Sequence, residues 1–323
     1  FESVSRDEVR LLDGRFLVKW HEEGRGAIKR RQDMPREAFL DPTYLKITKL
    51  HTIAISYCWV TPTHPDPEAF HLAMVVQLLK KFLEGDPDNI NDFVDSVKQA
   101  RFVSGIAPDV QLGLFWDFLS LPQHPCSASD SKLRKAALEN INAWYGHESV
   151  TKWILPDLPA ASLDWRSGYG ESGWTTFEYE VGNILSPPGR MLRWDATGRW
   201  RKQQTYIRAC FEAAKACSRS GPMDPAAFDA VAGALRFGNE ADFDDIVKLK
   251  YREAFEAIIT NASSVSFRAY EMSAANLKKS LHCIRHHCNQ HLRHLNLERA
   301  LPESASANVE DLLAELTTAS DGG

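Results

Sequence analysis

The sequence predicts an α/β fold in which a mostly parallel sheet is flanked by helices, with an all-helical appendage on its C-terminal side. Between residues 46 and 200, short apolar runs of strand length alternate with longer amphipathic segments. Such alternation is typical of parallel strands joined by right-handed crossovers. From residue 201 to residue 300, helical patterns follow one another with no strand pattern between them, which indicates a helical appendage that packs on the sheet domain or stands beside it.

The first elements are assigned as follows. Residues 1–45 form an N-terminal extension, in which GRFLVKWHE (14–22) is interpreted as a strand. The first strand of the α/β region is TIAISYCW (52–59), an apolar run with high β propensity. A helix is expected over FHLAMVVQLLKKFLEG (70–85), because Asp66 is a favourable N-cap shortly before it.

The alternation continues along the chain. VQLGLFWDFLSL (110–121) is interpreted as a buried strand and SKLRKAALENINAWYG (131–146) as one helix. VTKWIL (150–155) is a further strand, followed by a helix at 174–185 and the short strand MLRW (191–194). Open parallel sheets bind ligands at the carboxyl ends of their strands, so side chains that follow these strands are expected to share one site.

Composition limits the class of protein. The charged fraction of 25% and the hydrophobic fraction of 44% are ordinary globular values. A net charge of -5 argues against nucleic acid and anionic membranes as partners, and no apolar run approaches the roughly 18 residues that span a bilayer. Six cysteines without a C-x-x-C pair favour reduced thiols and an intracellular, cytoplasmic protein. The first residue is Phe1, not Met, which indicates a fragment or processed form that can lack a targeting signal.

The C-terminal segments carry two further hypotheses. Residues 301–323 have few large apolar side chains apart from one short amphipathic patch, and they are expected to form a flexible tail or a docking helix. In HCIRHHCNQHLRH (282–294), a metal site is suggested by Cys283, His287, His291 and His294, which share one helix face. Ligands must converge on one point, whereas successive turns of one helix offer two or three at most. We therefore expect an exposed basic helix face and no metal.

The stretch SGYGESGWTTFEYE (167–180) fits a G-x-G-x-x-G pattern through Gly168, Gly170 and Gly173. This pattern is typical of a dinucleotide-binding loop, and Asp195 stands where a ribose-binding acid would follow. An NAD-dependent oxidoreductase is therefore one hypothesis. The preceding strand ends well before the first glycine, however, whereas such loops follow their strand directly. We favour a glycine-rich approach loop to a helix that carries Glu178.

Three short motifs resemble the fungal heterokaryon-incompatibility (HET) domain: SYCW and WDFLSLPQ at two strand ends, and WTTFE on a helix. HET domains are in turn similar to Toll/interleukin-receptor (TIR) domains. The resemblance covers residues 50–195 and implies a flavodoxin-like, TIR-like parallel sheet. In enzymatic TIR domains the glutamate of a W-x-x-x-E helix cleaves NAD. The positions that match these motifs are Ser56, Tyr57, Trp59, Asp117, Pro122, Gln123, Trp174 and Glu178.

The resemblance implies that NAD is a substrate, that no cofactor is needed and that Glu178 is catalytic. The substrate-binding residues that it implies are Ser56, Tyr57, Trp59, Asp117, Gln123 and Trp174. Enzymatic TIR domains often self-associate to complete their site, so self-association or a protein partner is expected through the helical appendage. The residues themselves favour the same role for Glu178, because cleavage of the nicotinamide–ribose bond creates a ribosyl cation that one carboxylate can stabilise.

Structural roles compete with this hypothesis. A glutamate near a helix N-terminus is favourable as a solvated charge. Asp117 lies in an apolar stretch, where a carboxylate can serve to cap a loop. With these roles, the chain would be a catalytically inactive TIR/HET-like protein-interaction module.

Overall fold

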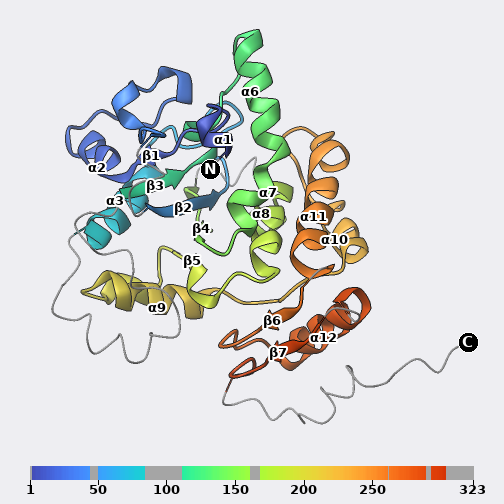
Figure 1. Ribbon diagram of the computed structural model, residues 1–323. Coiled ribbons are helices and arrows are strands. Elements are labelled where there is room, and N and C mark those ends of the chain that lie inside the picture. The colour runs from blue at the N-terminus through green and yellow to red at the C-terminus, as the bar shows by residue number, and fades with distance from the viewer. Residues whose placement is uncertain are drawn as a thin grey trace, which may run out of the picture.

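The computed structural model describes residues 2–43, 50–83, 111–160, 168–260, 262–288 and 292–302. It shows a central sheet with helices on both faces and a C-terminal group of helices beside it (Figure 1). The α/β fold expected from the alternation of strands and helices is confirmed. Within these ranges, no helix combines the length and the apolar character that crossing a membrane requires.

The central sheet has the strand order β1-β3-β2-β4-β5. Its strands are β1 (Leu12–Asp13), β2 (Leu50–Tyr57), β3 (Gln111–Phe115), β4 (Val150–Leu155) and β5 (Met191–Arg193). All pairings are parallel except that of β1 with β3 at the edge. Ile53 of the central strand β2 aligns with Leu114 of β3 and Thr151 of β4. The carboxyl ends of β2 and β3 are therefore neighbours.

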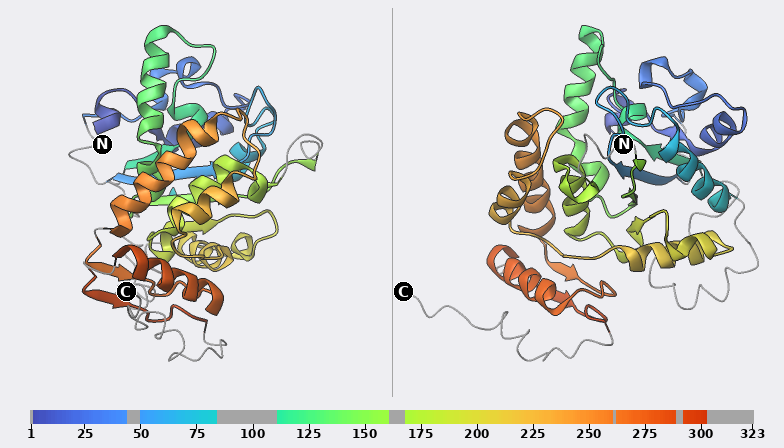
Figure 2. Two further views of the ribbon diagram at one scale, coloured as in Figure 1. Left: turned by 90° about the vertical axis from the view of Figure 1, so that its right-hand side faces the viewer. Right: turned by 180° about the vertical axis from the view of Figure 1, so that it is seen from behind.

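Helices cover both faces of the sheet (Figures 1 and 2). One layer consists of α2 (Gly14–Glu22), α3 (Phe70–Leu83) and α9 (Tyr206–Ala216), and it shares a core with Ile53 and Ile55. The other layer consists of α7 (Ile141–Gly146), α8 (Gly173–Asn183) and α11 (Lys248–Phe255), and it shares a core with Ala54. Because successive side chains of a strand point to opposite faces, Ser56 is directed toward the α8 layer and Tyr57 toward the α3 layer.

The prediction of a strand at residues 14–22 is wrong, because this segment forms helix α2. Asp13 caps the helix by accepting a hydrogen bond from the backbone N–H of Arg15 at 2.8 Å. Leu17 and Trp20 stand three positions apart and are both buried, which is the helical period. Only the two-residue β1 just before the helix joins the sheet.

Two other expected elements have different bounds. The expected strand 110–121 ends at Phe115, and the short helix α5 (Asp117–Ser120) follows it. The expected helix 131–146 is divided into α6 (Ala128–Glu139) and α7. The division lies at Asn140, whose backbone leaves the helical conformation (φ -114°, ψ 16°).

Helix α3 begins at Phe70, and Asp66 binds its first turn as expected of a capping residue. The carboxylate accepts from the backbone N–H groups of His71 and Leu72 at 3.1 and 2.8 Å. The shorter helices are α1 (Glu2–Ser5) and the 3-10 helices η1 (Arg31–Asp33), η2 (Arg36–Ala38), η6 (Tyr169–Glu171), η7 (Pro188–Arg190) and η8 (Arg199–Lys202).

The chain from residue 217 to residue 302, called the C-terminal unit here, is mainly helical, but the expectation of helices alone is wrong. Its helical elements are α10 (Pro225–Ala232), η9 (Phe243–Val247), α11, η10 (Glu256–Thr260) and α12 (Ala274–Cys288). The strands β6 (Ser264–Ser266) and β7 (His294–Asn296) form a separate parallel pair. Three-residue strands are too short to leave a periodic pattern in the sequence. Residues 303–323 of the expected tail lie outside the described residues.

Candidate active site

Glu178 lies in the middle of α8 and is bound to the carboxyl end of β2. The hydroxyl of Ser56 donates a hydrogen bond to Oε2 of Glu178 at 2.5 Å. The same hydroxyl lies 2.5 Å from the phenol oxygen of Tyr169 in η6. Tyr145 of α7 donates to the carbonyl oxygen of Ile55 at 3.2 Å, and its hydroxyl also lies beside the Glu178 carboxyl. Hydroxyl groups from three elements therefore surround this carboxyl.

Asp117 is the first residue of α5, two positions after the end of β3, and it accepts a second set of hydrogen bonds. Its Oδ1 accepts from the hydroxyl of Tyr57 at 2.9 Å and from the backbone N–H of Phe118 at 2.7 Å. Its Oδ2 accepts from the indole N–H of Trp59 at 3.2 Å. The ring of Trp59 also packs edge-on against Phe118, with centroids 5.6 Å apart. These contacts hold the loops that follow β2 and β3 together.

The two sets meet at one end of the sheet, as the sequence predicts for side chains that follow parallel strands. Ser56 and Tyr57 are buried, whereas Trp59, Asp117 and Glu178 keep part of their surface exposed. The negative charge of Asp117 acts on the Glu178 carboxyl. The site is thus a pair of neighbouring carboxyl groups with access to solvent, lined by aromatic rings and hydroxyl groups.

Protein atoms around both carboxyl groups shift their ionisation. Burial raises the pKa of Glu178 to about 8; the hydrogen bond from Ser56 opposes this rise, and the charge of Asp117 adds to it. Burial also raises the pKa of Asp117, against the hydrogen bonds from Tyr57, Phe118 and Trp59. Glu178 is therefore mostly protonated at neutral pH, and a cation bound beside it would favour its charged form.

Two of the residues implied by the motifs make their contacts away from the Glu178 carboxyl. The indole N–H of Trp174 donates to Oδ2 of Asp242 at 2.9 Å, which ties α8 to the C-terminal unit. The side chain of Gln123 donates to the backbone carbonyl oxygens of Asp117 and Leu121, so it holds the α5 loop. The structure does not bring either side chain beside the Glu178 carboxyl.

The glycines of the G-x-G-x-x-G pattern have different surroundings. A Cβ atom on Gly173 would overlap the ring of Phe237, whereas Cβ atoms on Gly168 and Gly170 would meet open space. The backbone N–H of Gly173 donates to the carbonyl oxygen of Arg236 at 2.8 Å. Gly173 is therefore explained by the close approach of the segment before η9. Asp195, the expected ribose-binding acid, lies 3.5 Å from the guanidinium of Arg193.

Tyr145 and Tyr169 belong to the site, but sequence reasoning did not select them. Tyr169 stands between Gly168 and Gly170 just before α8, and this placement next to the helix is the signal that could have pointed to it. Tyr145 lies on α7, ten positions before Leu155, and is therefore not adjacent to any strand end in the sequence. Its contact with the Glu178 carboxyl depends on how α7 packs across β2, and no local sequence pattern specifies that packing.

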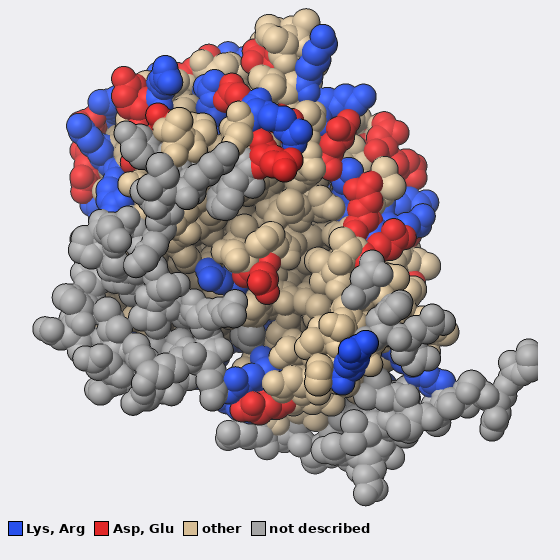
Figure 3. Space-filling model, viewed as in Figure 1, with Lys and Arg blue, Asp and Glu red and all other residues tan. Residues whose placement is uncertain are grey.

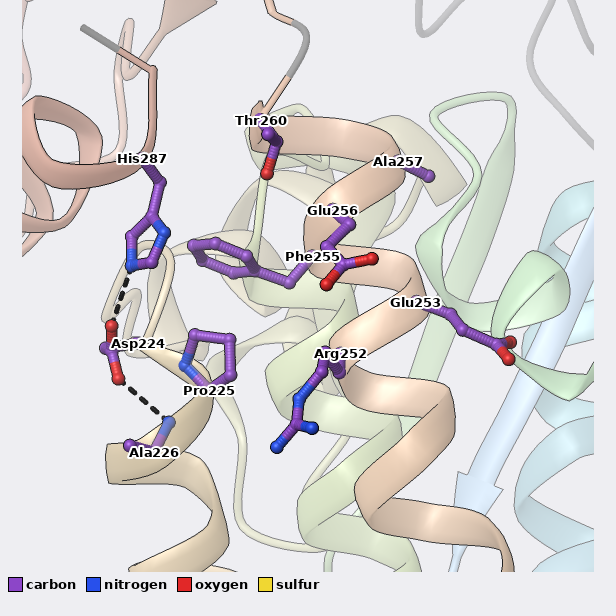
Figure 4. Close-up of a pocket in the computed structure, with 10 residues that line it drawn as sticks. All are labelled: Asp224, Pro225, Ala226, Arg252, Glu253, Phe255, Glu256, Ala257, Thr260 and His287. Carbon is purple, nitrogen blue, oxygen red and sulfur yellow. Dashed lines mark hydrogen bonds and ion pairs between the residues drawn. The ribbon is translucent and has the colours of Figure 1, made fainter.

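A separate pocket of about 850 Å³ opens in the C-terminal unit between α10, α11, η10 and α12 (Figure 4). His287 and Asp224 form a hydrogen bond on its wall, with Nε2 and Oδ2 2.7 Å apart. Asp224 also caps α10 through the backbone N–H of Ala226, and the ring of His287 packs against Phe255. These contacts attach α12 to the helices beside it.

The expectation that Cys283, His287, His291 and His294 share one helix is wrong, because α12 ends at Cys288 and His294 lies in β7. Cys283 is buried, His287 binds Asp224, and His291 lies outside the described residues. In the ranges that the structure describes, no three or more His, Cys, Asp or Glu side chains are grouped to hold a metal ion.

Charged side chains are mixed on the face shown in Figure 3. Acidic and basic groups of the described residues are interspersed around its upper and right-hand edges, and uncharged side chains fill much of its centre. A nucleic-acid interface is typically a field of positive charge, and this face shows mixed signs instead.

Comparisons with protein-family models, with curated proteins and with solved structures find no match for this chain.

Proposed function

We propose that this chain hydrolyses the nicotinamide–ribose bond of NAD and that Glu178 stabilises the ribosyl cation. The observation that carries the proposal is the contact of the part-exposed Glu178 with Ser56 at the carboxyl end of β2, beside Asp117. Open α/β sheets bind their ligands at this end of the strands. A carboxyl with a strongly raised pKa in such a position is a candidate for a functional group.

Hydrolysis of the nicotinamide–ribose bond requires one carboxylate and a water molecule. The C1′–N bond breaks with its electron pair remaining on the nicotinamide nitrogen, so the leaving group departs neutral and needs no general acid. The carboxylate of Glu178 stabilises the positive charge that develops on the ribose. Water then adds to C1′ and releases a proton, which gives ADP-ribose and free nicotinamide.

The raised pKa of Glu178 is compatible with this role. In the free protein, burial favours the protonated acid. The pyridinium ring of NAD carries a positive charge, and its binding beside Glu178 would shift the carboxyl toward its charged form. Trp59 supports the proposal as a wall of the site, because its contacts with Asp117 and Phe118 hold its ring in place.

The direct test is release of nicotinamide from NAD by the purified chain. We expect wild-type turnover and a loss of about 100-fold or more in Glu178→Gln. Glu171→Gln, an exposed acid in η6, is the matched control and should retain activity. Assays over a range of protein concentrations would show whether self-association is needed.

Two outcomes would contradict the proposal. One is the absence of nicotinamide release at every concentration and pH, which would favour a catalytically inactive interaction module. The other is release that Glu178→Gln leaves undiminished. Stoichiometric NAD binding without consumption would instead favour the oxidoreductase hypothesis.

A further inference from the structure

Arg134 of α6 is a cation beside the candidate active site. It follows Asp130 by one helical turn, and Ala137 of the same helix packs into the core that contains Leu121. Helix α6 follows α5, which begins at Asp117, and it leads into α7 (Figure 1). The positive charge of Arg134 is near enough to act on the Asp117 carboxyl.

Protein groups leave the guanidinium of Arg134 available for a ligand. Among the described residues it has neither an ion pair nor a hydrogen bond, and its Nε is buried without a partner. The residue keeps part of its surface exposed. Arg10 and Arg31 nearby are engaged instead, with Asp7 at 2.7 and 3.0 Å. Since no carboxylate of the described residues pairs with this guanidinium, its remaining N–H groups can bind an anion.

We propose that Arg134 binds the diphosphate of a dinucleotide whose nicotinamide-bearing ribose lies at Glu178. The two carboxyl groups suit ribose hydroxyls and a cationic ring, but they repel phosphate. A nucleotide at this site therefore needs a cation at the rim, and a guanidinium matches phosphate oxygens in geometry and charge. The ligand would extend from Glu178 past Asp117 to α6.

The identity of the ligand rests on the proposed function, so the first experiment separates the two. NAD, nicotinamide mononucleotide and nicotinamide riboside share the bond to be cleaved, but the riboside has no phosphate. We expect Arg134→Gln to raise KM for NAD and for the mononucleotide about 10- to 100-fold, with a smaller increase in Arg134→Lys. The riboside should be cleaved equally by wild type and both variants.

Lys135→Gln is the matched control, because it removes an exposed charge from the same helix. It should change KM for none of the three substrates. Equal effects of Arg134→Gln on NAD and on the riboside would overturn the subsite. They would leave Glu178 catalysis intact.

A binding experiment gives a readout that does not depend on turnover. ADP-ribose is titrated into the full chain by calorimetry, and thermal unfolding checks that each variant is folded. We expect ADP-ribose to bind wild type and to bind Arg134→Gln about 10- to 100-fold more weakly. Such a difference in a chain that does not cleave NAD would support the phosphate subsite while refuting the proposed hydrolysis. The subsite is refuted by equal binding to both proteins, or by no binding to wild type.

Discussion

The hydroxyl oxygen of Ser56 lies 2.5 Å from Oε2 of Glu178, although 122 positions separate the two residues along the chain. The contact joins the end of β2 to the middle of α8. It stabilises the charged form of a carboxyl whose surroundings favour the neutral form. The packing of α8 on the sheet therefore controls how readily Glu178 ionises.

The pH dependence of hydrolysis follows from the ionisation of Glu178. Because kcat/KM reports the free protein, it should rise with pH and level off above about 8, where Glu178 carries its charge before substrate binds. The rise of kcat with pH should occur at a lower pH than that of kcat/KM, since the pyridinium ring of bound NAD favours the charged form of Glu178. Initial rates between pH 5 and 10 measure both profiles. A kcat/KM that is flat over this range would contradict the assignment.

Ser56→Ala removes the hydrogen bond that opposes the effect of burial. We expect the pKa of Glu178 to rise further, so that kcat/KM at pH 7 falls about tenfold and recovers in part at higher pH. The matched control is Ser129→Ala, an exposed serine on α6. An equal loss at every pH would indicate a general disturbance of the site and not an effect on ionisation.

Glu178 should also affect stability in a pH-dependent way. Its pKa in the folded chain, about 8, exceeds its ordinary value of 4.5, so folding favours the protonated acid. This contribution is complete below pH 4.5 and is lost as pH rises through 8. Relative to wild type, Glu178→Gln should therefore be more stable at pH 9 than at pH 5, by roughly 2 to 4 kcal/mol. Urea unfolding at the two pH values measures the difference, and a pH-independent effect would count against the raised pKa.

Gly173→Ala tests whether the glycine pattern serves packing or nucleotide binding. The new methyl group would overlap the ring of Phe237, and we expect destabilisation by roughly 1 to 3 kcal/mol. Adding Phe237→Ala should restore part of the space, so the double variant should lose less than the sum of the single losses.

Gly168→Ala and Gly170→Ala are the controls, because a Cβ at either position meets open space. Both should be close to neutral in unfolding experiments. If these two substitutions abolished NAD binding while leaving stability unchanged, a dinucleotide loop would be the better explanation.

Local sequence patterns are sufficient to predict the layers of the fold and the end of the sheet where the candidate site lies. The apolar runs at 52–59 and 150–155 became β2 and β4, and their alternation with helices implied parallel pairing. Parallel pairing brings Ser56 and Asp117 to one edge because strand ends coincide there. The expected strand at 14–22 is wrong because its apolar residues fit the two-residue period of a strand as well as the 3.6-residue period of a helix. Only the buried face of the segment distinguishes the two, and that face is helical.

By itself, the sequence determined the α/β class and the end of the sheet where acidic and aromatic side chains gather. Only the tertiary structure decided which groups touch Glu178: it brought Tyr145 and Tyr169 beside the carboxyl and attached Trp174 to Asp242 instead. The physical reason is that periodicity specifies which face of an element is buried. The contacts of one side chain depend on where neighbouring helices cross the sheet, and so does the desolvation that raises its pKa.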